Sequence, residues 1–534
     1  MIDGDTHKSV ARSALQFLTG TFISRFTGML RDLSMAYCFG TSSAVAGFLV
    51  AFRLANLLRR IFGEGALLNG FIPFFESIRK EDPKKGAEFF RDLFWSLSIT
   101  LFLIILALES ILGLSCYWFH ISESIEQIIH MTMVMLPGIL FICLFGLSIA
   151  LLQCERKFFL PGVAPVAFNI AWIASVWIFR RQAPYHAMTG ISVGIVIAFF
   201  CQWCVTVSGL KKYLSQFLSL KEWCKGNIFS KDLKKMIAPL LLGVVGVAAV
   251  QINSAVDVII ACFSSLEGPA YLSYASRIQQ LPLALFGIAI SSALLPPLTR
   301  AIKQENSDHF KSLLSFGFLK TFNLLLPATV AIFVLGGLSV NLLYGRGMFS
   351  NLSTINTTLC LWGYGIGLVP SAFVLILAPA FYARQDFWTP TLASLWSVAI
   401  NLALSVAAVF FFKMESFGIA LATSAASFFN MGFLIYKLDR KVMNPLAGAF
   451  VKTTFSAFVA GLITILAGHF FMNEPSLKMW FGNFEVVFAR ELFTQANQFS
   501  LLTLLFGIIF FGAAYFLQAE DVLDLFSFRK KTGT

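Results

Sequence analysis

Apolar runs of about 20 residues recur from one end of the chain to the other, and each is long enough to cross a bilayer as a helix. The runs are much longer than the roughly 10-residue alternating segments of an outer-membrane barrel. With 57% hydrophobic and only 13% charged residues, the 534-residue chain also departs from soluble composition. We therefore predict an all-α integral membrane protein with fourteen transmembrane helices, at about 9–38, 44–75, 90–114, 123–152, 158–180, 188–210, 234–264, 268–300, 309–338, 355–384, 389–412, 417–437, 447–472 and 497–518.

The net charge of +12 is distributed unevenly over the predicted loops. With the N-terminus in the cytoplasm, one set of loops and tails carries 26 of the 40 lysines and arginines, whereas the opposite set carries six. This is the positive-inside bias of a membrane protein, so it favours a multi-pass protein with both termini cytoplasmic over a nucleic-acid-binding protein. The remaining eight basic residues fall inside the spans: Arg25, Arg31, Arg53, Arg59, Arg60, Arg277, Lys320 and Lys452.

An arginine near the bilayer centre costs about 2.5–3.5 kcal/mol on insertion scales, so its side chain must face a wet cavity or a counter-charge. On a helical wheel, Arg53, Asn56, Arg60 and Glu64 form one polar stripe of the second span. In the first span, Arg25 and Arg31 lie about 120° apart. Converging guanidinium groups suit a phosphate or pyrophosphate, because their planar fork donates paired hydrogen bonds.

A structural explanation of these arginines competes with the binding explanation. They could pair with Asp32, Glu64 or Asp257, or bond to helix carbonyls, and simply hold the bundle together. Acids inside the spans are too few to neutralise every arginine, and a buried unpaired charge is costly. We therefore expect Arg25, Arg53 and Arg277 to bind an anion, and leave both explanations open for Arg59 and Arg60.

An internal repeat appears when the sequence is shifted by 224 residues. Arg53 then pairs with Arg277, Gly63 with Gly287, Pro73 with Pro297 and Glu81 with Glu305. Six spans per half predict two parallel lobes related by a pseudo-twofold axis along the membrane normal. We expect an N-terminal lobe at 1–210, a basic amphipathic cytoplasmic linker at 211–235, a C-terminal lobe at 236–440, and two extra helices with a cytoplasmic tail at 441–534.

Metal and enzyme signatures are missing from the sequence. The six histidines never cluster, and the CxxC of Cys201 and Cys204 has neither a second pair nor a nearby histidine, so we interpret it as packing. The sequence contains no GxSxG, Walker loop or HExxH. We expect a transporter without cofactor or metal, and the sequence names no coupling ion.

Three stretches, SRFTGMLRD, VAFRLANLLRRIFGEGALLNGFIP and APAFYARQDFWTP, resemble the MurJ/MviN lipid II flippases of the multidrug/oligosaccharidyl-lipid/polysaccharide exporter superfamily. The resemblance implies two six-helix lobes around a cationic cavity, with the last two spans forming a groove for a polyprenyl tail. It implies that lipid II, an undecaprenyl-pyrophosphate-linked muropeptide, moves from the inner to the outer leaflet of the bacterial cytoplasmic (inner) membrane for peptidoglycan synthesis. Its functional cations fall on Arg25, Arg31, Arg53, Arg59 and Arg277, with Lys452 as a looser match; Asn56 joins this substrate-binding set.

This chain departs from the family pattern at positions where relatives often carry acids. They are occupied here by Ala46, Ser276 and Gln280, which puts gating and ion coupling in question. We expect gating or charge balance from Asp32, Glu64, Ser276 and Gln280.

Other functions remain open from the sequence alone. The leading hypothesis is a lipid II flippase working by alternating access. A flippase for another polyprenyl-linked glycan or an ion-coupled drug exporter is an alternative, although a cationic drug would be repelled by this cavity. A membrane glycosyltransferase is a different class, and it would need catalytic acids in the loop at about 473–496. A scaffold for cell-wall enzymes would leave the intramembrane arginines unexplained.

Overall fold

The computed structural model describes the backbone of residues 7–62, 66–118, 121–155, 157, 159–227, 230, 233, 256–438, 447–470, 475–481, 487–519 and 522. All regular elements in these ranges are helical, which confirms the predicted all-α class. The chain divides into two compact units, Met1–Val258 and Ile259–Thr534.

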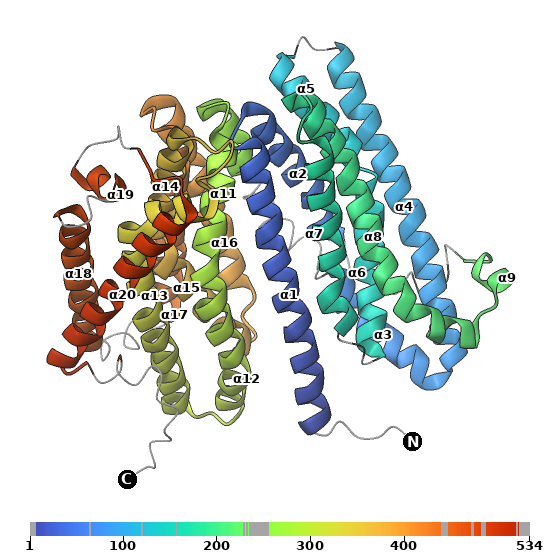
Figure 1. Ribbon diagram of the computed structural model, residues 1–534. Helices are drawn as coiled ribbons and strands as arrows, with labels where there is room; N and C mark the ends of the chain where they lie inside the picture. The colour runs from blue at the N-terminus through green and yellow to red at the C-terminus, as the bar shows by residue number, and fades with distance from the viewer. Residues whose placement is uncertain are drawn as a thin grey trace. The chain divides into compact units, whose positions relative to one another are not determined.

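Within its described residues the first unit contains nine helices: α1 (His7–Phe39), α2 (Ser43–Phe62), α3 (Ala66–Glu81), α4 (Pro83–Trp118), α5 (Glu123–Met135), α6 (Gly138–Cys154), α7 (Phe159–Phe179), α8 (Pro184–Phe217) and α9 (Leu220–Trp223). Helix α7 packs against α1 on one side and α8 on the other, α6 also packs on α8, and α2 packs on α5 (Figure 1). Helices α3, α4, α6 and α8 share a buried apolar core that includes Phe71, Phe90, Leu151 and Leu210.

Two local features shape α1. The helix ends where Gly40 adopts a φ of 60°, and the Gly40 N–H donates to the Ala36 carbonyl at 2.9 Å. A glycine in this left-handed conformation is a common helix terminator, because it has no Cβ to clash. Nearer its start, a Cβ on Gly20 would lie 2.8 Å from the backbone carbonyl carbon of Gly162, so α1 and α7 approach backbone to backbone.

The segment after α8 packs against α4. Helix α8 continues to Phe217, seven residues into the predicted linker. Ser219 and Glu222 then form a reciprocal capping box at α9. Trp223 lies beside Phe94 at a ring-centroid distance of 5.2 Å, and its carbonyl accepts a hydrogen bond from Trp95 Nε1 at 2.9 Å.

Charged groups reinforce this packing. The Asp92 carboxylate accepts from the Asn227 N–H at 2.9 Å, Arg91 Nη1 donates to the Glu222 carbonyl at 3.1 Å, and Lys84 Nζ forms an ion pair with Glu222 at 3.1 Å. Hydrogen bonds from the Ser219 backbone and hydroxyl, together with Lys84, lower the pKa of Glu222 to about 2. The segment 218–227, called the connector below, is therefore held against the first unit by specific hydrogen bonds, an ion pair and aromatic packing.

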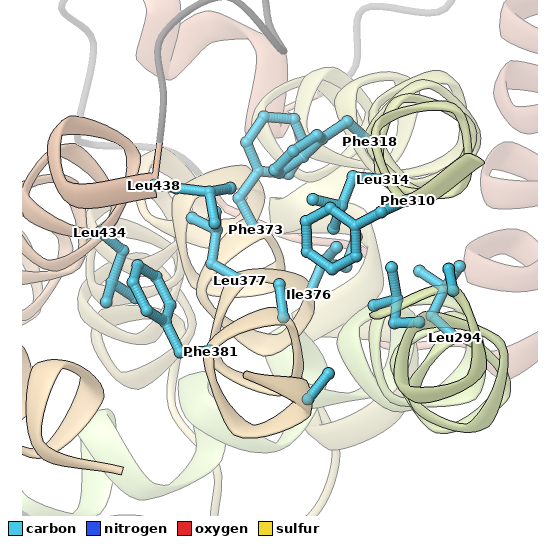
Figure 2. Close-up of a cluster of buried hydrophobic side chains, with 14 of the residues drawn as sticks. Leu294, Phe310, Leu314, Phe318, Phe373, Ile376, Leu377, Phe381, Leu434 and Leu438 are labelled. Atoms are coloured by element: carbon cyan, nitrogen blue, oxygen red, sulfur yellow. The ribbon is translucent and has the colours of Figure 1, made fainter. Parts of the chain in front are cut away.

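The second unit is also helical: α11 (Gly268–Pro282), a π-helical turn (Leu283–Ile288), α12 (Ala289–Lys303), α13 (Ser307–Tyr344), α14 (Asn351–Ile366), α15 (Leu368–Ala383), α16 (Trp388–Val406), a second π-helical turn (Ala407–Phe411), α17 (Glu415–Leu438), α18 (Ala447–Phe470), α19 (Pro475–Lys478), a 3₁₀ turn (Met479–Phe481) and α20 (Leu492–Phe516). Figure 2 shows its main core, where phenylalanines from α13 and α15 interdigitate with leucines from α12 and α17. Phe318 and Phe373 meet there edge to face at 5.0 Å.

Helices α18 and α20 belong to this second unit. They pack against each other and against α13, with Phe506 and Phe510 of α20 in one apolar cluster with Ala457 and Ala460 of α18. Thr453 of α18 also donates its hydroxyl to Asn323 Oδ1 of α13 at 2.7 Å. The two extra helices of the sequence prediction thus share a core with α13.

Among the described residues, nine helices are long and apolar enough to cross a membrane, and the number rises to eleven if each of two bent pairs forms one span. One pair is α5 and α6, bent by 44° at Leu136 and Pro137, and the other is α14 and α15, bent by 41°. The eleven correspond to predicted spans. The other three predictions are 9–38, 44–75 and 234–264. The first two carry every intramembrane arginine except Arg277, and most of the third lies outside the described residues. The exact count of fourteen and the repeat remain predictions.

Candidate substrate site

Helix α1 carries two of the predicted arginines in different environments. The Arg25 side chain is exposed, whereas Arg31 is buried, with 8% of its surface accessible. Arg31 donates from Nε and Nη2 to Asp32 Oδ1 at 3.0 and 2.8 Å. Asp32 therefore balances the charge of Arg31. This is the pairing with Asp32 that the structural explanation of the arginines proposed.

Helix α7 supplies the rest of the Arg31 environment. Asn169 Oδ1 accepts from Arg31 Nη1 at 3.1 Å, and the guanidinium lies 4.5 Å from the centroid of the Trp172 ring, in cation–π geometry. Sequence reasoning missed both Asn169 and Trp172. The available signal was a single asparagine in an apolar span, since buried amides need partners.

Helix α2 exposes Arg53, whereas most of its apolar residues described by the structure are buried. Phe52 and Phe48 meet Trp172 edge to face at centroid distances of 4.8 and 5.6 Å. Trp172 thus contacts Arg31 of α1 and the apolar face of α2. The predicted ligand Asn56 is half-buried, and its Nδ2 donates to the Phe52 carbonyl at 2.8 Å.

Two further predicted residues belong to the same predicted span as Arg53. The side chain of Arg59 and the whole of Glu64 lie outside the described residues. Ala46, at the position where the family resemblance led us to look for an acid, is buried with 1% of its surface accessible.

In the second unit, α11 presents Arg277 and Gln280 on an exposed face. Other residues of the same helix are buried, including Tyr274, Ala275 and Ile278. Ser276 is half-buried, and its hydroxyl donates to the Ser273 carbonyl at 2.9 Å. Because Arg277 belongs to a different unit from Arg25 and Arg53, their convergence on one anion remains a prediction.

Lys452 is exposed on α18, close to the last turn of α20. Its Nζ donates to the Gln518 carbonyl at 3.2 Å. A cavity of about 450 Å³ lies here, lined by Gly448, Ala449, Lys452, Thr453, Gln518, Ala519 and Val522. The lysine therefore lies on this cavity rather than on the arginine-bearing helices of the first unit.

Metal chemistry has no support within the described part of the chain. No group of three or more histidine, cysteine, aspartate or glutamate side chains there could hold a metal ion. Cys201 is half-buried and Cys204 exposed on α8, and both are free thiols. The candidate site therefore consists of arginine, lysine and asparagine side chains carried by apolar helices.

Comparison with known proteins gives a consistent result at the level of sequence. Residues 35–488 match the family model described as "Lipid II flippase MurJ". The chain is 31% identical over 550 residues to the "Probable lipid II flippase MurJ" of Chlamydia muridarum, covering 99% of this chain and 98% of that protein. A protein of Chlamydia trachomatis with the same name is 30% identical over 542 residues, again covering 99% and 98%.

Solved structures show that the fold is shared. A structure titled "Lipid II flippase MurJ, inward closed conformation" matches with a TM-score of 0.74 and 21% identity, covering 94% of this chain and 99% of that one. An inward-facing multidrug resistance MATE family transporter matches with a TM-score of 0.62 and 14% identity, covering 81% and 98%.

These matches decide between the functional classes left open by the sequence. The relatives are named as flippases, which are transporters, so the prediction of a transporter rather than an enzyme is confirmed. The apolar helices make the protein a multi-pass membrane protein. On the family model and the full-length similarity to its relatives, the chain belongs to the MurJ family of lipid II flippases.

Proposed function

We propose that this protein moves lipid II from the inner to the outer leaflet of the bacterial cytoplasmic membrane, where it serves peptidoglycan synthesis. The observation that carries the proposal is the exposure of Arg25, Arg53 and Arg277 on otherwise apolar helices. An arginine on such a helix is strongly unfavourable against lipid tails, so its exposed side chain must meet water, a counter-charge or an anionic ligand. Family membership makes the pyrophosphate of lipid II the fitting anion.

The arginines divide into two roles in this proposal. Arg25, Arg53 and Arg277 bind the pyrophosphate directly, because a guanidinium donates paired hydrogen bonds to phosphate oxygens. Arg31 is buried against Asp32 and α7, and its role is to hold α1, which carries Arg25, in position. Asn56 shares the predicted polar stripe of α2 with Arg53, and Arg59, about 120° from Arg53 on the helical wheel, completes the proposed substrate-binding set of this span.

The division of the chain into two compact units supports an alternating-access mechanism. In this mechanism the units rock so that the headgroup meets first one side of the membrane and then the other, while the lipid tail stays in the bilayer. Asp32, Glu64, Ser276 and Gln280 would balance charge or gate this movement. Both termini would lie in the cytoplasm, following the positive-inside bias.

The lipid tail is assigned to α18 and α20. Their exposed side chains include Phe455, Phe458, Leu504 and Ile508, which suit contact with a polyprenyl chain. Lys452, on the cavity beside Gln518, would meet a polar group of the same lipid.

The test replaces Arg25, Arg53 and Arg277 singly by alanine and by lysine in cells depleted of their own flippase. A charge-assisted hydrogen bond is worth about 1.5–3 kcal/mol, so each alanine variant should bind undecaprenyl pyrophosphate about 10- to 150-fold more weakly. Rescue should be lost with alanine and partly kept with lysine, while membrane insertion stays normal. Arg490→Ala, at an exposed position before α20, is the matched control.

Two results would contradict the proposal. Full rescue by all three alanine variants would remove the arginines from the mechanism. Accumulation of a different polyprenyl-linked glycan in the inner leaflet of depleted cells, with lipid II distributed normally, would change the substrate.

A further inference from the structure

Asn169 is a nearly completely buried amide in α7, with 4% of its surface accessible. Its helix is otherwise strongly apolar, so an amide is costly there unless all its groups are paired. Asn169 is not among the residues predicted to bind the pyrophosphate. Its position calls for a physical explanation.

The Asn169 side chain bonds to α1 at three points. Oδ1 accepts from Arg31 Nη1 at 3.1 Å. Nδ2 donates to the Ser24 carbonyl at 3.1 Å and to Thr27 Oγ1 at 3.0 Å. One amide therefore holds about two turns of α1, from Ser24 to Arg31.

Arg25 lies inside the stretch that Asn169 holds. Its exposed side chain projects from the residue that directly follows Ser24. A shift of α1 along α7 would break the Ser24 and Thr27 bonds and move Arg25 with the helix. The amide thus fixes both the height and the rotation of α1 at the point where Arg25 leaves it.

Arg31 completes the same support. Its Nε and Nη2 donate to Asp32, its Nη1 donates to Asn169, and one face of its guanidinium lies against Trp172. Because these contacts are made inside the first unit, Arg31 is suited to hold α1 in place rather than to bind the substrate.

We propose that Asn169 is a positioning residue for transport, which locks α1 through Arg31, Ser24 and Thr27 so that Arg25 meets the substrate pyrophosphate in a fixed geometry. The inference rests on the proposed function, because it takes Arg25 as a pyrophosphate ligand. It goes further, because the geometry of the contact between Arg25 and the pyrophosphate would then depend on Asn169, which does not touch the substrate.

The experiment measures the affinity of the purified full-length protein in nanodiscs for undecaprenyl pyrophosphate. The variants are Asn169→Leu, Arg25→Ala and the double variant. Interhelical hydrogen bonds in membranes correspond to about a 3- to 20-fold effect, so Asn169→Leu should weaken binding by that factor. In the Arg25→Ala background the same change should have less than about a 2-fold effect, since positioning matters only when the positioned group is present.

Controls separate positioning from general stability. Ser192→Ala removes another buried polar group of the first unit, whose hydroxyl donates to the Met188 carbonyl at 2.8 Å, and it should leave affinity unchanged. If Asn169→Leu does not fold, Thr27→Val removes one of the three bonds. It should give a smaller loss of affinity that again disappears with Arg25→Ala.

The outcomes distinguish the two proposals. If Asn169→Leu and Thr27→Val bind normally while Arg25→Ala is impaired, the positioning inference is wrong and the proposed function stands. If the losses from Asn169→Leu and Arg25→Ala multiply independently, Asn169 does not act through Arg25. If Arg25→Ala itself binds normally, the assignment of the pyrophosphate to Arg25 fails, and the inference fails with it.

Discussion

Gly226 in the connector lies where a side chain would meet Trp95, and its replacement by alanine tests whether the connector is held against α4. An added Cβ would clash with Trp95 Cδ1 and would lie 2.8 Å from Cγ. Trp95 cannot easily turn away, because its Nε1 donates to the Trp223 carbonyl at 2.9 Å. Gly226→Ala should therefore separate the connector from α4 without unfolding the helices.

The expected size follows from two opposing effects. Overpacking a fitted contact costs about 1–3 kcal/mol. Replacing glycine by alanine recovers about 0.4–1 kcal/mol by restricting the unfolded chain. A net cost of about 1–2 kcal/mol would raise the fraction of molecules with an open connector about 5- to 30-fold, at tenfold for each 1.4 kcal/mol.

Limited proteolysis can measure this opening, because the exposed Lys221 and Lys225 are trypsin sites within the connector. When opening and closing are fast, the cleavage rate follows the open population, so cleavage at these lysines should rise by the same factor. Gly432→Ala is the matched control, since a Cβ there meets nothing within 4 Å. Equal cleavage of the Gly226→Ala variant and the wild type would refute the docking of the connector.

The connector should also respond to acid. Its Glu222 has a pKa lowered from 4.5 to about 2, so the stabilisation from its charge is complete above pH 4.5 and is lost as the pH falls towards 2. A spin label on Cys224, with the other cysteines replaced, should become mobile in that pH range. In the Glu222→Gln variant the same label should already be mobile at pH 7. A label that stays immobile at pH 2 in the protein with Glu222 would contradict this prediction. On α1, Gly20→Ala should lower the thermal stability of the purified protein by about 1–3 kcal/mol, because the Cβ would meet the α7 backbone at 2.8 Å. Gly28→Ala should be tolerated, since its nearest contact is Asn169 Nδ2 at 3.6 Å, and equal melting of the two variants would show that α1 and α7 do not pack this closely.

Much of the fold was predictable because hydrophobic length carries strong information in a membrane protein. The spans from α13 to α17 follow the predicted ranges to within several residues. The bend between α5 and α6 falls at Pro137, which the sequence places inside a span and which cannot donate a helical hydrogen bond. The connector was harder, since its contacts join Asp92 to Asn227 across 135 residues, and no periodicity reports such a pair.

The candidate site shows where a wheel projection succeeds and where it stops. Arg25 and Arg31 are six residues apart, and at 100° per residue this places them about 120° apart, so they cannot serve one ligand equally. The structure agrees, with Arg25 exposed and Arg31 buried against α7. The wheel could not say which of the two would be buried, because that depends on Asn169 and Trp172, which lie 138 residues or more along the chain. Function divides the same way: a substitution at Arg25 should act on the anion directly, whereas one at Arg31 should act through the position of α1.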